Sequence, residues 1–494
     1  MATYYVRKTG NDSNAGTSPG AAWLTITKAL GASGIESGDT VYIGAGTYRE
    51  TVNVQMTSAT AETKVIGDVT GEHTGDAGEV LWTGYTTDDE SGAGATSTCL
   101  LSGRDYLTFE HLTMVASTSP WAAPVIDGQN VTDSTNITLR RCTFLAAQGG
   151  GSRGMIEATA SFGTTLNWLI EECVFVDLRC AVSGFWGVLV FKGPCSASGA
   201  HYDLGIAIRN CMVLGGSWGV YCERTGGDNT NKPGGVLVEN CTMLWQVDGC
   251  VRASNSWSTT IPAQVRNSML ISPRGTALSA ATSGMLTEDW NYIYANTNRT
   301  NVSAGSDSVA RDGTNAYAPM LEFGQALMRG ARARAFGEPT VGSPYLGFGS
   351  AGSPPTVDLF GRPRPAGGPI LNAVGALERS NSGVRETTVV RTGSSSLRIT
   401  GPGYHDFELP VEATATEVKV WARYDSDHGA TNKPQIQVRN GEECGVAEDT
   451  ETMAAAADTW EELTLSFTPA SRGIVTIRCI SRAAAANGNA YFDD

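Results

Sequence analysis

The chain has 494 residues, of which 59 are glycine and only 17% are charged, a composition that suits a turn-rich all-β protein. Its net charge of −15 argues against nucleic acid as a partner, because nucleic-acid binding depends on cationic contacts to phosphate. No apolar stretch approaches the roughly 18 residues needed to cross a membrane, and the first residues lack the apolar core of a signal peptide. We therefore expect no membrane partner, and either no export by the signal-peptide route or a chain trimmed at its start.

Residues 1–60 are predicted to form an N-terminal cap and a first coil of strands. The segment 23–35 carries apolar residues at helical spacing, and Thr25 or Thr27 could cap the helix. A short amphipathic helix is expected there, because the first coil of a solenoid has an apolar end that needs cover. Residues 38–50 then read as a strand, a glycine turn and a second strand.

Residues 61–280 are predicted to form stacked coils, because one short alternating phrase recurs in this region. An example is Ile137-Thr-Leu-Arg-Arg-Cys142, and such alternation is the period of a strand. The phrase ends at Leu112, Cys142, Cys173, Cys211, Cys241 and Ser268. Steps of 27 to 38 residues between these positions indicate a repeat architecture.

Each repeat holds a second β-prone run and no helix. A leucine-rich repeat would need a helix or its leucine pattern, and a propeller blade would be longer and built from antiparallel hairpins. The sequence therefore predicts a parallel β-helix of about nine or ten coils, right-handed by the preference of parallel crossovers.

Each phrase places two charged or amide residues before a small residue, which predicts an outward corner followed by an inward side chain. Equivalent residues would then stack at about 4.8 Å. We expect Cys142, Cys173, Cys211 and Cys241 to form a column of buried thiols, since cysteine is a small apolar filler. A disulfide framework is the alternative, although the odd count of 11 cysteines does not favour it. No Cys/His cluster has zinc-site spacing.

The period is lost over residues 281–379, which are predicted to hold the last coils and an irregular C-terminal cap. Residues 380–386 read as a linker. Over residues 387–494 six or seven short alternating strands suggest an antiparallel β-sandwich. The predicted fold class is therefore all-β, a parallel β-helix followed by a jelly-roll β-sandwich.

The first part of the chain resembles the pectin-lyase-like superfamily of right-handed parallel β-helix proteins. The segments Gly38-Asp-Thr-Val41 and Gly46-Thr-Tyr-Arg-Glu50 look like its opening coil. The segment Asp358-Leu-Phe-Gly-Arg-Pro-Arg-Pro365 looks like the closing segment of many bacterial and phage members. The superfamily holds lyases, hydrolases, epimerases, adhesins and tailspikes, so the resemblance implies a fold and not one function. Phage proteins of this kind are usually homotrimers, and a homotrimer is the implied assembly.

The C-terminal part resembles jelly-roll carbohydrate-binding modules. The matching segments are Gly393–Leu397, Thr459-Trp460 and Phe492–Asp494. The resemblance implies a glycan ligand and a structural calcium ion, for which Asp493 is the candidate. Trp421 is expected beside Lys419 on the wetter face of its strand. Trp421 and Tyr424 are therefore predicted sugar contacts.

The β-helix offers a second predicted carbohydrate site. The 38-residue step between Cys173 and Cys211 carries an insertion, and long loops on a rigid scaffold commonly carry function. The predicted sugar contacts are His201, Tyr202, Asp203, Trp218 and Glu223.

Catalytic candidates are Asp177, Asp203 and Asp228, because glycoside hydrolysis needs paired carboxylates. Aspartate also favours turns for its own sake, so a structural role is the alternative for each. The sequence motifs of polygalacturonases and pectate lyases are absent.

Three functions remain open at this point. The first is a virion or surface structural protein that engages a polysaccharide or cell-surface glycan, such as a phage tailspike, fibre or decoration protein. It would be located on a virion or outside the cell, with other virion proteins as partners. The second is a polysaccharide lyase or glycoside hydrolase on the same fold, and the third is a scaffold without a ligand.

Overall fold

A computed structural model gives the structure of the chain in two compact units, the first described up to Asp312 and the second from Gly383. The described residues are 1–56, 60–85, 97–101, 103–115, 124–128, 133–146, 154–177, 187–196, 200–225, 231–254, 257–305, 308–312, 383–386, 388–391, 396–411, 414–429, 433–439, 447–468, 473–483 and 488–493. The predicted closing segment 358–365 and the candidate Asp228 lie outside them.

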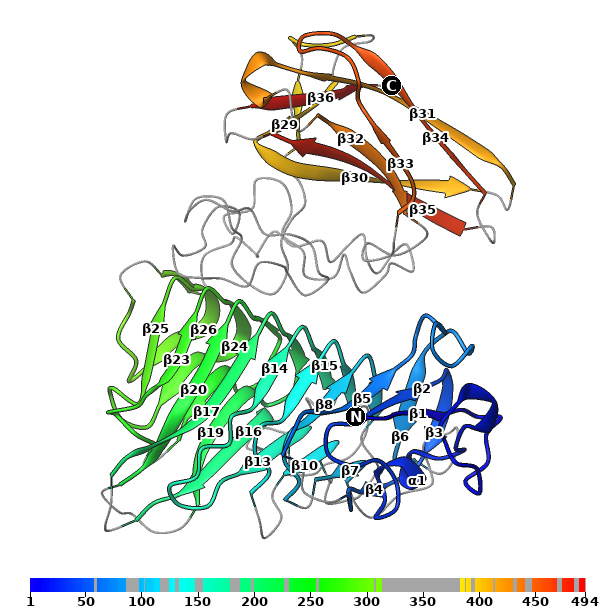
Figure 1. The fold of residues 1–494 in the computed structure, drawn as a ribbon. Coiled ribbons are helices and arrows are strands. Elements are labelled where there is room, and N and C mark those ends of the chain that lie inside the picture. The colour runs from blue at the N-terminus through cyan, green and yellow to red at the C-terminus, as the bar shows by residue number, and fades with distance from the viewer. Residues whose placement is uncertain are drawn as a thin grey trace. The chain divides into compact units, whose positions relative to one another are not determined.

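The first unit is a parallel β-helix, and one of its faces is a ten-stranded sheet (Figure 1). In spatial order its strands are β1 (Thr3–Val6), β2 (Thr40–Ile43), β5 (Thr63–Gly67), β8 (Leu107–Glu110), β11 (Thr138–Arg140), β14 (Leu169–Glu171), β17 (Tyr202–Arg209), β20 (Pro233–Glu239), β23 (Ala263–Arg266) and β25 (Leu286–Asp289). Each strand pairs in parallel with the equivalent strand of the next coil, as a solenoid requires. The predicted β-helix is confirmed, and ten strands on this face agree with the expected number of coils.

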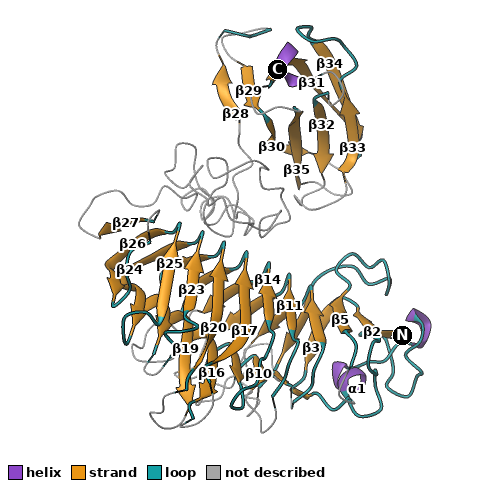
Figure 2. Ribbon diagram, turned by 60° about the vertical axis from the view of Figure 1, so that its left-hand side comes forward, coloured by secondary structure: helices purple, strands orange, loops and turns teal. Residues whose placement is uncertain are grey.

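Two further faces complete the coils (Figure 2). The second face holds β3 (Gly46–Arg49), β6 (Val80–Thr83), β9 (Thr113–Val115), β12 (Thr143–Ala146), β15 (Val174–Asp177), β18 (Met212–Gly215) and β21 (Thr242–Leu244). The third holds β4 (Val52–Asn53), β7 (Cys99–Leu100), β10 (Ile126–Gly128), β13 (Ile156–Thr159), β16 (Gly187–Pro194), β19 (Trp218–Thr225) and β22 (Gly249–Ala253).

The second and third faces merge in the last coils. The long strand β24 (Met269–Ala280) pairs with β21 on one face and with β22 on the other. β26 (Tyr292–Thr300) pairs with β24, and β27 (Val309–Asp312) pairs with β26. The coils therefore continue through residue 312, beyond the point where the repeated phrase stops.

The corner between the first and second faces is made by one residue with a positive φ in seven coils. These residues are His111, Arg141, Glu172, Asn210, Asn240, Asn267 and Trp290, with φ between 51° and 57°. Asparagine tolerates this backbone region better than most side chains, which explains the amides in the repeated phrase.

The residue before each corner faces outward and carries a charge. In register along the sheet these residues are Glu110, Arg140, Glu171, Arg209, Glu239, Arg266 and Asp289. The sign alternates at every step, so each side chain has opposite charges as neighbours on the adjacent strands. We term this row the charge ladder.

The predicted column of thiols is confirmed. Cys142, Cys173, Cys211 and Cys241 are buried and unpaired, and each Sγ lies 3.2–3.5 Å from carbonyl oxygens of its own and the preceding coil. On the second face the rings of Phe144 and Phe175 stack with centroids 4.8 Å apart. Equivalent residues thus occupy one column, as the spacing predicts.

The thiol column becomes polar toward the last coils. Ser268 follows Cys241 in the column, and its Oγ accepts a hydrogen bond from the Cys241 N–H at 3.1 Å. Asn291 follows Ser268 and accepts from its N–H at 2.9 Å. Nearby, the buried Glu288 accepts from the guanidinium of Arg299 at 2.6 and 2.8 Å.

The N-terminal helix is shorter than the sequence predicts. α1 spans Ile26–Leu30, because Trp23 still forms a strand-like bridge with Val6. Thr25 caps it, accepting from the Lys28 N–H at 3.0 Å. The carboxylate of Glu50 accepts from the first two helical N–H groups, which gives the end of the 46–50 motif a structural role. No helix in the described part of the chain is both long and apolar enough to cross a bilayer.

The second unit is an antiparallel sandwich, as predicted. One sheet has the order β28 (Gly383–Glu386), β29 (Ser396–Thr400), β36 (Asn489–Asp493), β31 (Thr416–Tyr424) and β34 (Glu461–Phe467). The other has the order β30 (Pro402–Val411), β35 (Gly473–Arg482), β32 (Gln435–Arg439) and β33 (Ala447–Thr452). β28 lies in the segment assigned to a linker and pairs with β29, so residues 383–386 belong to the sandwich instead.

Candidate functional site

Two coils of the β-helix have extended strands. β16, β17, β19 and β20 have seven or eight residues each, whereas β13, β14, β22 and β23 have three to five. The extensions pair with one another, Pro194 with Thr225 and Tyr202 with Pro233. We term these extensions the flange, and the insertion noted in the sequence lies within it.

His201 and Tyr202 help to hold the flange together. Nδ1 of His201 accepts from the Lys232 N–H at 3.2 Å. The Tyr202 hydroxyl donates to the Pro194 carbonyl at 2.8 Å, and burial raises the pKa of this phenol. Its side chain is nearly buried, so Tyr202 offers little surface to a sugar.

The three aspartates proposed for catalysis do not form a pair in the described residues. Asp203 is exposed, and its Oδ1 accepts from the Gly205 N–H at 2.7 Å, which is a turn role. Asp177 is buried at the end of β15, opposite Gly215. The whole of β16 separates Asp177 from Asp203 along the coil, and Asp228 is not described.

The outer side of the third face holds a buried lysine between two carboxylates. Nζ of Lys192 lies 3.9 Å from Oε2 of Glu157 and 3.9 Å from Oε2 of Glu223. Glu157 is fully buried, whereas 22% of the Glu223 side chain is exposed. Burial raises the pKa of the Glu223 carboxyl, against the opposing effects of Lys192 and Arg252.

Next to this triad lies an apolar cluster of Val190, Trp218 and Tyr221. The guanidinium of Arg252 lies 5.4 Å from the ring centroid of Trp218 and 5.5 Å from that of Tyr221. Trp218 is only 6% exposed, which is a correction to its predicted role as an open sugar platform. The group that faces outward here is Arg252, and we term Arg252, Trp218, Tyr221, Glu223 and Lys192 the third-face patch.

The sequence did not single out Glu157, Lys192 or Arg252. Each lies in the third-face strand of a different coil. Only the pairing register of these strands brings them near Glu223 and Tyr221. A usable signal was present, since charged residues interrupt runs that are otherwise apolar, as in Gly187-Val-Leu-Val-Phe-Lys192.

In the sandwich Trp421 and Tyr424 have different environments. Trp421 is half-buried on the outer face of β31, and the guanidinium of Arg391 lies 3.4 Å from its ring centroid. Lys419, two residues before it, is exposed and pairs with Glu462 at 2.9 Å. Tyr424 is 2% exposed and belongs to the core, with its hydroxyl donating to the Ala455 carbonyl, so its predicted role as a surface contact is corrected.

Asp493 is buried at the end of β36. Its Oδ2 accepts from the Arg391 N–H at 2.8 Å. No group of three His, Cys, Asp or Glu side chains in the described ranges is placed to hold a metal ion. The calcium ion therefore stays a prediction from the resemblance.

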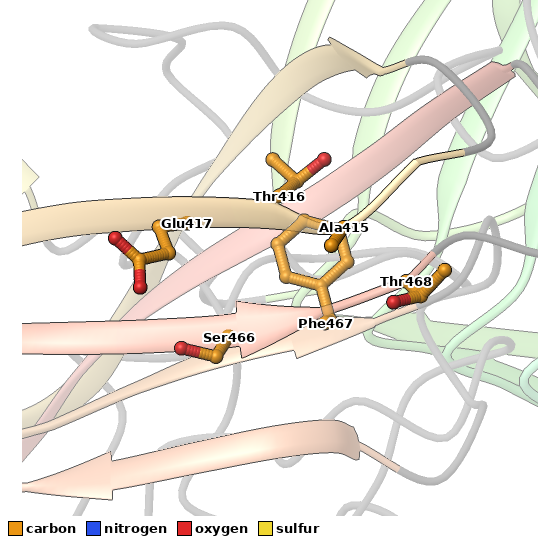
Figure 3. Close-up of a pocket in the computed structure, with 6 residues that line it drawn as sticks. All are labelled: Ala415, Thr416, Glu417, Ser466, Phe467 and Thr468. Carbon is orange, nitrogen blue, oxygen red and sulfur yellow. The ribbon is translucent and has the colours of Figure 1, made fainter.

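A hollow of about 590 Å³ lies beside the start of β31 and the end of β34 (Figure 3). Its lining residues are Ala415, Thr416, Glu417, Ser466, Phe467 and Thr468. Glu417 is the one charged residue in this lining, so the hollow lacks the paired groups that acid–base chemistry needs.

No protein-family model matches the sequence, and no curated protein matches it. Among solved structures, XylC in complex with xylose is 14% identical over 60% of this chain and 69% of that chain, with a TM-score of 0.38. A tailspike protein of Acinetobacter baumannii bacteriophage Fri1, a capsular polysaccharide depolymerase, is 10% identical over 92% of this chain and 81% of that chain, with a TM-score of 0.31. A family 16 carbohydrate-binding module is 12% identical over 23% of this chain and 82% of that chain, with a TM-score of 0.18. At these scores the likenesses carry no functional argument, and the fold rests on the strand pairing.

Proposed function

We propose that this protein is a virion or surface structural protein that engages carbohydrate, in the manner of a phage tailspike, fibre or decoration protein. The observation that carries the proposal is the third-face patch. It places a half-buried guanidinium on two aromatic rings, beside a partly exposed carboxylate. Sugars present many hydroxyl groups, and a few fixed charged donors and acceptors orient such a ligand.

The sandwich supports the same proposal with a second surface. The outward face of its five-stranded sheet presents Trp421 against Arg391, next to the Lys419–Glu462 pair. A glycan could contact the β-helix and the sandwich through separate repeats of one polymer. Two weak sites on one chain raise the effective affinity without any new contact.

An enzymatic form of the proposal, as a polysaccharide lyase or hydrolase, is favoured by one observation. Glu157 and Glu223 each have an oxygen 3.9 Å from Nζ of Lys192, so these two oxygens lie no more than about 8 Å apart, and glycosidases act through a pair of carboxyl groups. Burial raises the pKa of the Glu223 carboxyl, which is the direction that a general acid requires. Glu223 would be the proton donor, and Lys192 would hold both carboxylates in place.

The proposed function is tested by printing bacterial capsular and wall polysaccharides on an array and measuring both binding and release of reducing ends. Binding without release supports a binding protein. Release that disappears in Glu223→Gln, with binding retained, supports the enzymatic form. If the wild-type chain neither binds nor cleaves any polysaccharide, the scaffold reading stands and the proposal is rejected.

A further inference from the structure

Arg252 differs from the other half-buried arginines of the β-helix. Arg140, Arg209 and Arg266 in the charge ladder each lie against a glutamate. The guanidinium of Arg252 makes no ion pair and no hydrogen bond with any described residue, and its close contacts are the two rings of Trp218 and Tyr221.

The neighbouring carboxylates do not neutralise Arg252. Glu223 is near enough to be influenced by it, yet Glu223 forms its ion pair with Lys192. Glu157 lies on the far side of Lys192 and is fully buried. Among the described residues, one cation with several N–H donors therefore faces outward from the third face with no ion-pair or hydrogen-bond partner.

From these contacts we infer that Arg252 binds the carboxylate group of an acidic sugar, a uronic acid or a comparable carboxylated residue. This inference rests on the proposed carbohydrate function and names its ligand class. A guanidinium is a planar fork that matches a carboxylate with two parallel hydrogen bonds. Contact with the rings of Trp218 and Tyr221 restrains the guanidinium and reduces the entropy lost on binding.

The surrounding charges favour a singly charged ligand group over a phosphate. The two glutamates and the two cations of this region balance, so a bound carboxylate adds a single net negative charge. A phosphate monoester would add a second negative charge close to Glu223, and this repulsion disfavours it.

The experiment compares each acidic polysaccharide on the array in its native form and after chemical reduction of its carboxyl groups to alcohols. The wild-type chain should bind native acidic members and lose about tenfold or more in apparent affinity for the reduced forms, because charged hydrogen bonds are lost. Phosphate-bearing glycans, treated or not with phosphatase, form a second arm, and binding confined to that arm would overturn the carboxylate assignment.

Variants locate the contact. Arg252→Gln should lower affinity for native acidic glycans by a similar factor and leave affinity for reduced glycans unchanged, and Arg252→Lys should fall between the two. Arg274→Gln is the matched control, since Arg274 is exposed on the adjacent strand β24.

The outcomes separate the two proposals. Equal binding to native and carboxyl-reduced glycans overturns this inference while the carbohydrate function stands. Absence of binding to every glycan overturns both. Carboxyl reduction changes only the ligand, so the test holds even if an Arg252 variant folds poorly.

Discussion

Nε of Arg266 lies 2.7 Å from Oε1 of Glu239, whose side chain is 2% exposed. Arg209 lies on the other side of Glu239, with its Nε 3.3 Å from Oε2. The three residues are consecutive members of the charge ladder. In a parallel stack with in-register rows, like charges would lie about 4.8 Å apart, so alternation of sign is what makes a charged row tolerable.

Glu239→Ala should destabilise the β-helix by about 2–3 kcal/mol, because it leaves the two arginines on either side of β20 without their shared anion. The loss of stability should be smaller than for a fully buried ion pair, because both arginines are partly exposed. Urea unfolding monitored by circular dichroism measures the change. Glu79→Ala, at an exposed position of the same unit, is the control, and equal losses in the two variants would contradict the ladder's role.

The thiols of the β-helix should resist alkylation in the folded protein. Of the nine described cysteines, Cys195 alone is not buried. Burial raises the pKa of Cys99, Cys222 and Cys250, and the thiolate is the reactive form. Treatment with iodoacetamide at pH 8, followed by peptide mass mapping, should modify these three thiols only after denaturant is added. Rapid modification of Cys222 or Cys250 in the native protein would show that the coils open locally.

The sandwich should lose stability on acidification because of His428. This side chain is fully buried, and burial lowers the pKa of its imidazole, against the opposing effects of Gly429 and Asp425. The Ser481 hydroxyl donates to the Gly401 carbonyl at 2.6 Å, and its Oγ lies 3.3 Å from Nε2 of His428.

The unfolded chain therefore takes up a proton first as the pH falls, and stability declines below about pH 6.5. Hydrogen exchange of peptides around residues 424–429, measured from pH 7.5 to 5, should report this loss. His428→Gln keeps a side-chain N–H and should flatten the dependence. A variant with the same pH dependence as the wild type would assign the effect to another group.

Trp421→Ala should weaken binding of the polymeric glycan severalfold, because it removes the ring that supports Arg391. Biolayer interferometry on an immobilised polysaccharide that the wild type binds measures this. Phe407→Ala is the control, as it removes an exposed ring from the opposite sheet. If the two variants bind alike, Trp421 packs against Arg391 for structural reasons alone.

The proposed homotrimer predicts a solution mass of three times the 51.9 kDa of one chain. Cyclic assembly would cover part of the long flat faces of the β-helix. Sedimentation equilibrium at micromolar concentration gives the mass directly. A single species with the mass of one chain would contradict the trimer.

The β-helix could be predicted from the sequence because similar residues recur at the corner between the first and second faces of each coil. Arg141 and Asn210 turn the chain, and Cys142 and Cys211 follow them into the core. The last coil was missed as a repeat because its phrase reads Asp289-Trp-Asn291, with a large ring at the corner and an amide in the thiol column.

Three sandwich strands were harder to predict, and each lies at the edge of a sheet. β30 contains Pro402 and Pro410, which are tolerated where no neighbour needs the missing N–H. β33 is an acidic and polar run, as suits an exposed edge. β28 sits in a serine-rich stretch that reads as a linker. The composition of these segments does not favour strands. They form strands because they pair with neighbouring strands in the folded sandwich.

The third-face patch was only half predicted, for a related reason. Trp218 and Glu223 were predicted as sugar contacts from their nearness to the insertion, while Lys192 and Arg252 lie in apolar runs that look like core. Their side chains face outward because of strand alternation, and their proximity comes from coil stacking. A site whose residues come from successive coils is therefore difficult to predict, because those residues are far apart in the sequence.

In seven coils the corner between the first and second faces has two residues, the first of them with a positive φ. The corner between the second and third faces has two residues between β18 and β19 but nine between β12 and β13. An insertion at the first corner would disturb the charge ladder and the thiol column on either side of it, whereas the second corner accepts added residues. New loops are therefore expected at the second corner and not at the first.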